Sequence, residues 1–421
     1  MRRAGFSVLA LAAVFAVVAV PEVSQATPVV PTVHPVMFAR HPAGASKPDD
    51  ITRLGDLLYI TYQNDAGKDG TPAGSFSTVI AYDSTGRTVA KYTIPGRCDG
   101  LTADPRNNRV LATANEDLNS SLFVIHPGTS APVHYTYSPD PAQHGSDGKN
   151  GGTDSISVAA NGKVYVAHSN PDPKLPAPNN APAVYTLKLT GSTAQLTPVF
   201  RVNDPATVIN AATAAAKPMG LTDPDSNEFL PNLHGGTLIQ GAQGDSKLVF
   251  ATNLNAALPT LKQLDLTNAT PPKHGAATPQ LDDLAQVTGP GTLYVVDQGP
   301  SAWIYAINTA DIAPGTVFAS QPNPSKGDLP NDPSLAVVDL KTGAVTHVRT
   351  PLTSPKGLLF VPAAAKTTTS LAGMPSTSSS NAPLLYGAGF IVVILGAGFA
   401  LLMWRRQRPS VTRSRTAQRP L

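Results

Sequence analysis

Four aspartates occupy the same place in repeated segments of this sequence. Each segment begins with an acidic or small residue and an aliphatic residue, continues through a turn and then enters a β-prone run. The four aspartates at the starts of these segments are Asp50, Asp99, Asp154 and Asp283. Carboxylates that converge repel one another unless a cation neutralises them, and Ca²⁺ is a hard cation that prefers oxygen ligands. The pattern therefore makes these four residues candidate ligands of a calcium site. The alternative is that each aspartate forms a turn and accepts hydrogen bonds from neighbouring backbone N–H groups.

A second polar set follows the next β-prone run of these segments. It comprises Asn64, Asp65, Asn115, Glu116, Asp117, His168, Asn170, Asn253, Asn255 and Asp297. The nine histidines never recur at the short spacing of metal-binding pairs, and no nucleophile elbow, P-loop or dinucleotide motif occurs. Cys98 is the single cysteine, which excludes an internal disulfide. We expect it to be a small buried hydrophobe rather than a nucleophile.

The repeated segment is one supersecondary unit. Complete copies cover residues 49–62, 99–115, 154–168, 219–253 and 282–297, and a partial copy covers 356–361. After each pair of strands comes a second hairpin around a Gly-containing turn, most clearly at residues 79–92 and 335–348. Each unit thus holds four short strands, and about six units fit in the chain.

The units predict an all-β fold. No amphipathic helix interrupts them, which removes the main support for a parallel βαβ fold. Four antiparallel strands repeated radially form a β-propeller, and six blades fit best, with five or seven as alternatives. We expect the run at residues 34–40 to be an outermost strand that closes the ring by joining the C-terminal strands.

This repeat resembles the NHL and YVTN-type propellers and, more loosely, the gluconolactonase-like six-bladed family. The resemblance rests on residues 98–105 followed by 108–113, and on residues 337–343. The gluconolactonase-like family implies Glu, Asn and Asp around a channel metal. Glu116 is only a loose substitute for the early glutamate of that family. Fold alone does not decide between binding and catalysis.

The two ends of the chain predict an anchored, outward-facing protein. Residues 1–26 have the order of a cleavable signal peptide, and 27–362 form the propeller ectodomain. A stalk rich in Ser, Thr, Ala and Pro follows at 363–382, then an apolar transmembrane helix at 383–404 and a basic tail at 405–421. Because basic residues beside a span stay in the cytoplasm, we expect a single-pass protein of the cell membrane with its N-terminal ectodomain outside.

Charge excludes one class of partner. The tail holds six arginines and no acid, so the excess of 31 basic over 28 acidic residues comes from the ends of the chain, and no basic patch with aromatic residues occurs between them. We therefore expect no nucleic acid. The sequence predicts a binding or interaction module for a protein, glycan or small-molecule ligand; the alternative is a Ca²⁺-dependent lactonase or hydrolase of the gluconolactonase-like class.

Overall fold

The computed structural model describes residues 30–145, 151–175, 180–233, 236–269, 278–321 and 334–364. They fold into short antiparallel strands with two 3₁₀ turns, η1 (Pro105–Asn107) and η2 (Pro141–His144), and no α-helix. Contacts divide the chain into Met1–Ala365 and Lys366–Leu421, and every described residue belongs to the first unit.

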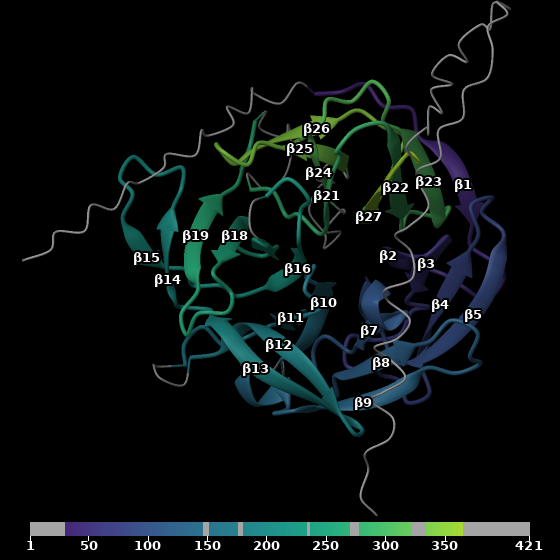
Figure 1. Ribbon diagram of the computed structural model, residues 1–421, viewed down its shortest axis with the longest axis horizontal. Helices are drawn as coiled ribbons and strands as arrows, with labels where there is room; N and C mark the ends of the chain where they lie inside the picture. Colours follow the sequence, from purple (N-terminus) through teal and green to yellow (C-terminus); the bar gives the residue numbers. More distant parts are fainter. Residues whose placement is uncertain are drawn as a thin grey trace, which may run out of the picture. The chain divides into compact units, whose positions relative to one another are not determined.

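The strands are arranged radially around a common centre (Figure 1). One sheet contains β2, β3, β4 and β5 in that order. The next sheet contains two sets of four antiparallel strands, β6 to β9 and β10 to β13. The two sets are joined by the parallel pairing of β9 with β13. The bounds are β2 (Pro48–Leu54), β3 (Leu57–Tyr62), β4 (Phe76–Tyr82), β5 (Thr88–Pro95), β6 (Cys98–Asp104), β7 (Arg109–Ala114), β8 (Ser121–Ile125), β9 (Val133–Ser138), β10 (Gly152–Val158), β11 (Val164–Ser169), β12 (Pro182–Thr190) and β13 (Thr193–Arg201).

Two further sheets carry additional strands at their outer edges. In one, β16 to β19 are extended by β14 and β15; in the other, β21, β24, β25 and β26 are extended by β20. The bounds are β14 (Pro205–Val208), β15 (Ala216–Pro218), β16 (Pro224–Glu228), β17 (Leu238–Ala242), β18 (Lys247–Thr252), β19 (Thr260–Asp265), β20 (Thr267–Asn268), β21 (Leu284–Gln286), β24 (Val317–Gln321), β25 (Ser334–Val338) and β26 (Ala344–Val348).

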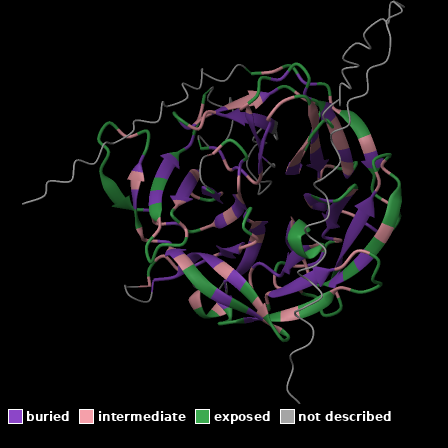
Figure 2. Cartoon of the chain, viewed as in Figure 1, coloured by how far each residue is buried: buried purple, intermediate pink, exposed green. Residues whose placement is uncertain are grey.

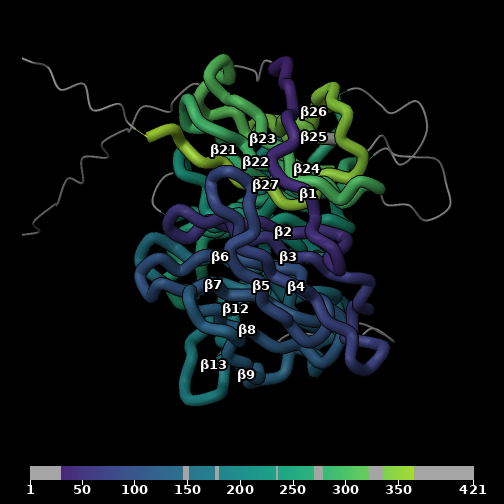
Figure 3. The backbone as a smooth tube through the Cα atoms, turned by 90° about the vertical axis from the view of Figure 1, so that its right-hand side faces the viewer, coloured from purple at the N-terminus to yellow at the C-terminus, as the bar shows by residue number. Residues whose placement is uncertain are grey.

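The last sheet joins the two ends of the described chain. Its order is β1 (Val36–Arg40), β23 (Trp303–Asn308), β22 (Gly291–Asp297) and β27 (Pro355–Pro362). The N-terminal strand β1 lies beside the C-terminal strands in the side view (Figure 3). The prediction that the N-terminal run closes the ring is confirmed.

Apolar side chains fill the space between successive sheets, and Figure 2 shows the buried inner strands. One cluster packs the β2–β5 sheet against β6–β8 and includes Tyr59, Val79 and Val110. Another packs the last sheet against the first, through Val296, Ile304 and Ile60. Cys98 is fully buried in the first of these clusters, as expected. Because each sheet buries both faces against its neighbours, the fold is a β-propeller.

Two strand assignments made from the sequence are wrong. The segment beginning at Asp282 does not pair with β22, because β21 pairs with β24, and β22 instead takes β27 as its inner partner. In the fourth copy, the inner strand is β16, which begins at Pro224, rather than the segment at Met219.

Within the described residues, no helix is long and apolar enough to cross a membrane. The predicted signal (1–26), span (383–404) and tail (405–421) lie outside those residues. The membrane anchor stays a prediction.

Candidate functional site

The inner strands share an irregularity that positions the site. In β2, β6, β10 and β16 the pairing register skips two residues near the strand start, between Pro48 and Ile51 in β2 for example. The pairing of β27 with β22 is shifted at the same place, at Lys356 and Gly357. A bulge turns residues away from the ladder and changes the direction of their side chains. Each bulge thus offers two successive residues to the centre of the ring.

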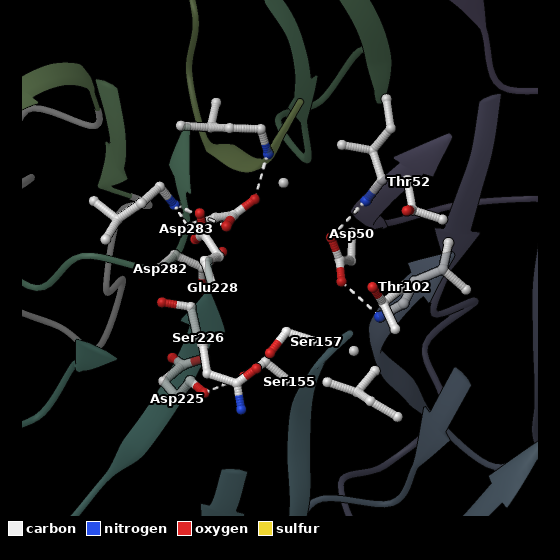
Figure 4. Close-up of a pocket in the computed structure, with 18 of the residues that line it drawn as sticks. Asp50, Thr52, Thr102, Ser155, Ser157, Asp225, Ser226, Glu228, Asp282 and Asp283 are labelled. Carbon is white, nitrogen blue, oxygen red and sulfur yellow. Dashed lines mark hydrogen bonds between the residues drawn. The ribbon is translucent and has the colours of Figure 1, made fainter. Parts of the chain in front are cut away.

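These bulge residues, with the two residues before β21, form two rings around one cavity of about 360 Å³. The first ring contains the leading residue from each inner strand: Asp49, Asp99, Asp154, Asp225, Asp282 and Lys356. The second ring contains the following residues: Asp50, Gly100, Ser155, Ser226, Asp283 and Gly357. Figure 4 shows Asp50 facing Asp225, Asp282 and Asp283 across the cavity.

The four aspartates predicted from the sequence all line this cavity, but they lie in different rings. Asp99 and Asp154 belong to the first ring, whereas Asp50 and Asp283 belong to the second. Within the described ranges, no group of three or more His, Cys, Asp or Glu side chains is placed to hold a metal ion. The calcium site stays a prediction.

Asp50 and Asp283 connect neighbouring inner strands. The Asp50 carboxylate accepts hydrogen bonds from the backbone N–H of Ile51 and of Leu101, both at 2.6 Å. Asp283 accepts from Leu284 at 2.7 Å and from Leu358 at 2.5 Å. Each carboxylate therefore satisfies one backbone group on the residue that follows it and one on the next inner strand.

Three cations enter the cavity on one side. Lys356 Nζ lies 2.6 Å from Asp282 Oδ1 and 3.7 Å from Asp49 Oδ1. Arg97 Nε lies 3.0 Å from Asp99 Oδ1, and Lys68 Nζ lies 3.1 Å from Glu116 Oε2. These cations occupy the sector formed by the β27, β2 and β6 strands and the loops beside them.

The opposite sector carries carboxylates without such partners. In the described part of the chain, no hydrogen bond or ion pair reaches the carboxylate of Asp154 or Asp225. On the neighbouring strand β6, Asp99 Oδ1 pairs with Arg97, whereas Asp99 Oδ2 is buried without a hydrogen-bond partner among the described residues. Asp154 is only 8% exposed. An unpaired buried carboxylate is costly, so this sector is open to an incoming positive charge.

Burial controls the protonation of these acids. It raises the pKa of Asp49 to about 8, although Lys356 opposes the rise. Burial also raises the pKa of Asp99 to about 6 against the effect of Arg97. The pKa of Asp154 rises well above its ordinary value through burial and then through the charges of Glu116 and Asp99. Perturbed acids gathered in one cavity are typical of functional sites.

Asp225 joins the acids with raised pKa values, through burial and then the charge of Asp154. Lys356 shows the opposite balance. Burial lowers its pKa, but the charges of Asp282 and Asp49 outweigh burial and raise it well above the ordinary value. We expect Lys356 to be charged in the folded protein.

The polar set after the second strands is mostly structural. Glu116 lines the cavity, but Asp297 accepts backbone N–H groups from Thr353 and from Ser354, the latter at 2.6 Å. His168 is fully buried, with Nδ1 2.8 Å from the carbonyl oxygen of Pro182. This set therefore contributes one carboxylate to the site.

Sequence reasoning missed Asp49, Asp225, Asp282 and Lys356. Asp49 and Asp282 belong to Asp-Asp pairs of which the second member was chosen. Asp225 lies in a strand that reads Pro-Asp-Ser-Asn-Glu and lacks the aliphatic residue used to find the other copies. Lys356 stands at the equivalent position with the opposite charge. All four occupy the first of the two cavity-facing positions near the start of an inner strand. A search for that position in every repeat would have identified them.

Comparisons with known proteins found similarity to solved structures only. No family model and no curated protein matches the sequence. Similar solved structures include the Pseudomonas aeruginosa periplasmic gluconolactonase PpgL, at 10% identity and TM-score 0.41, covering 75% of this chain and 88% of that one. The WD40 β-propeller domain of Doa1 is similar at 9% identity and TM-score 0.36, covering 78% and 88%. At such low similarity, neither structure transfers an activity to this chain.

Proposed function

We propose that this protein is a binding module that takes a small-molecule ligand into the central cavity of a six-bladed propeller. The observation that carries the proposal is the convergence of two residues from every inner strand on one cavity of about 360 Å³. Concave sites of this size, with a few convergent polar groups and perturbed acids, are the usual form of ligand sites. We count one blade for each of the inner strands β2, β6, β10, β16, β21 and β27.

The test is to identify what occupies the cavity. The full-length protein, purified from its native membrane, is analysed by native mass spectrometry for a co-purified small molecule. In Thr102→Trp, an indole replaces a side chain that lines the cavity (Figure 4). In the matched control Thr93→Trp, the change lies on the exposed face of β5. We expect a stoichiometric molecule in the wild type and the control, and its loss from Thr102→Trp; equal occupancy in all three would contradict the proposal.

The hydrolase alternative is tested with the same protein. A calcium-dependent lactonase would hydrolyse glucono-1,5-lactone only with Ca²⁺, would melt at a higher temperature with Ca²⁺, and would lose both effects in Asp154→Ala. The binding proposal predicts no lactone turnover with or without Ca²⁺. Calcium-dependent turnover that Asp154→Ala abolishes would replace the binding module with the hydrolase.

The proposed place of this module is the outer face of a membrane. The support is the order of signal, stalk, apolar span and basic tail in the sequence. Protease added to intact cells is expected to cut the stalk at 363–382 and release the propeller, while the basic tail stays with the cells. A propeller that is protected until the cells are lysed would reverse the orientation.

A further inference from the structure

The protein itself places an ammonium group between two first-ring carboxylates. Lys356 occupies the leading position of β27, where the other inner strands carry aspartate. Its Nζ lies 2.6 Å from Asp282 Oδ1 and 3.7 Å from Asp49 Oδ1, on the two neighbouring inner strands. The first ring thus binds an ammonium cation by charge-assisted contacts to adjacent aspartates.

A second pair of first-ring carboxylates, Asp154 and Asp225, has no cation in direct contact among the described residues. Asp154 and Asp225 lead the adjacent inner strands β10 and β16, and their carboxylates have no hydrogen-bond or ion-pair partner among the residues described. Asp154 is 8% exposed, and Asp99 Oδ2, on the strand before it, is also buried and unpartnered.

The charges around this pair are mainly negative. Glu116, Asp99 and Asp223 act on Asp154, and Lys68 opposes them. Asp154, Asp282 and Asp223 act on Asp225, and Lys356 opposes them from its contact with Asp282. Lys68 already pairs with Glu116 at 3.1 Å. Asp154 is buried and Asp225 is half-buried. Two such carboxylates without partners are unfavourable by themselves, so a bound cation would relieve both their desolvation and their mutual repulsion.

On the basis of the proposed binding function, we propose that the ligand is an organic amine whose ammonium group binds between Asp154 and Asp225, as Lys356 binds between Asp282 and Asp49. An ammonium group donates up to three hydrogen bonds and needs no closed ligand shell. A divalent metal fits less well, because no three acidic or His side chains in the described ranges are placed to hold one. The cavity wall also includes Phe229, Leu230 and Phe360, which suit the apolar part of an amine.

Calorimetric titration of the full-length protein in detergent at pH 8 tests this inference. The probes are butylamine, its uncharged analogue 1-butanol, and CaCl₂. Loss of a charge-assisted contact costs about 1.5 kcal/mol or more, which is about tenfold in affinity. We expect butylamine to bind at least about tenfold more tightly than 1-butanol.

Variants locate the binding. Asp154→Asn and Asp225→Asn are each expected to weaken butylamine binding at least about tenfold, and Asp154→Glu to retain most of it. The control Asp56→Asn removes the same charge from a fully exposed side chain and should leave the affinity unchanged. Melting curves show that each variant is folded.

Three results would overturn the inference: equal affinity for butylamine and 1-butanol, unchanged butylamine affinity in Asp154→Asn, or tight calcium binding that Asp154→Asn abolishes. If one of these occurs while Thr102→Trp still loses the co-purified molecule, the amine assignment fails and the binding function survives. If no molecule occupies the wild-type cavity and butylamine does not bind, both fail.

Discussion

Lys356 and Asp282 form a 2.6 Å ion pair across the 74 residues that separate them in the sequence. The pair links β27 to the residues that lead into β21, and the partly exposed Lys356 side chain also lies 3.7 Å from Asp49. The ion pair therefore connects the C-terminal inner strand with the strands on both sides of it.

Removal of this cation should destabilise the protein. Lys356→Met leaves the Asp282 carboxylate without its positive partner in a largely buried setting, and breaking a buried pair costs about 3 kcal/mol. We expect a clear fall in melting temperature. The control Lys91→Met changes an exposed lysine on β5 and should have almost no effect. The double variant Lys356→Met/Asp282→Asn should recover part of the loss, and a Lys356→Met protein as stable as the wild type would refute the pair's role.

Stability should fall as the pH rises through about 8. Burial raises the pKa of Asp49 to about 8, so the folded state holds its proton where the unfolded chain has lost it. The stabilisation that this raised pKa provides is fully present below the ordinary pKa of aspartate. It is lost as the pH rises through the pKa of Asp49 in the folded state. His168 does not interfere above pH 6.5, because burial lowers its pKa to about 4. The melting temperature between pH 6.5 and 9 should therefore decline less in Asp49→Asn than in the wild type; identical slopes would count against the assignment.

Gly100 should not tolerate a side chain. A Cβ at this position would lie 2.5 Å from the backbone oxygen of Asp154 and 2.7 Å from Ser155 Cα, because the inner strands approach closely here. We expect Gly100→Ala to cost about 2 kcal/mol of unfolding free energy. Gly191→Ala is the comparison: it adds strain at a φ of +60° but has open space, and should cost about 1 kcal/mol. Chemical denaturation measures both, and a smaller loss for Gly100→Ala would show that the strands are further apart.

A disulfide across the ring closure should stabilise the propeller. Val36 on β1 is the register partner of Ala306 on β23, and antiparallel partners lie close enough for a disulfide. The double variant Val36→Cys/Ala306→Cys closes a very long loop, which gives about 5 to 6 kcal/mol in the chain-entropy model. Melting temperatures with and without reductant measure the gain, and Val36→Cys alone is the control. Failure of the two thiols to form a disulfide would mean that β1 does not pair with β23.

The sequence revealed the fold class because strands and turns are local signals. Alternating residues and Gly-containing turns identified hairpins such as β4–β5, and the Asp-led segments identified β2, β6 and β10. The pairing of Leu284 was missed because nothing local distinguishes β22 from β24 as its partner. Ring closure makes the C-terminal strand β27 the inner partner of β22. The spacing of the repeats along the chain does not indicate this pairing.

The site was predicted in part for a related reason. All four aspartates chosen from the sequence reach the cavity, but a slip of one residue within Asp49-Asp50 or Asp282-Asp283 exchanges a first-ring side chain for a second-ring one. Whether a carboxylate faces the cavity or accepts N–H groups from the next strand depends on the bulge. The roles of Asp50 and Asp154 could therefore be separated only in three dimensions.

The most direct test is a crystal structure of the full-length protein grown with butylamine. The account predicts electron density for the ammonium group within hydrogen-bond distance of both Asp154 and Asp225, with Lys356 still paired to Asp282. Density for the amine elsewhere, or Asp154 and Asp225 turned away from a common cavity, would contradict it.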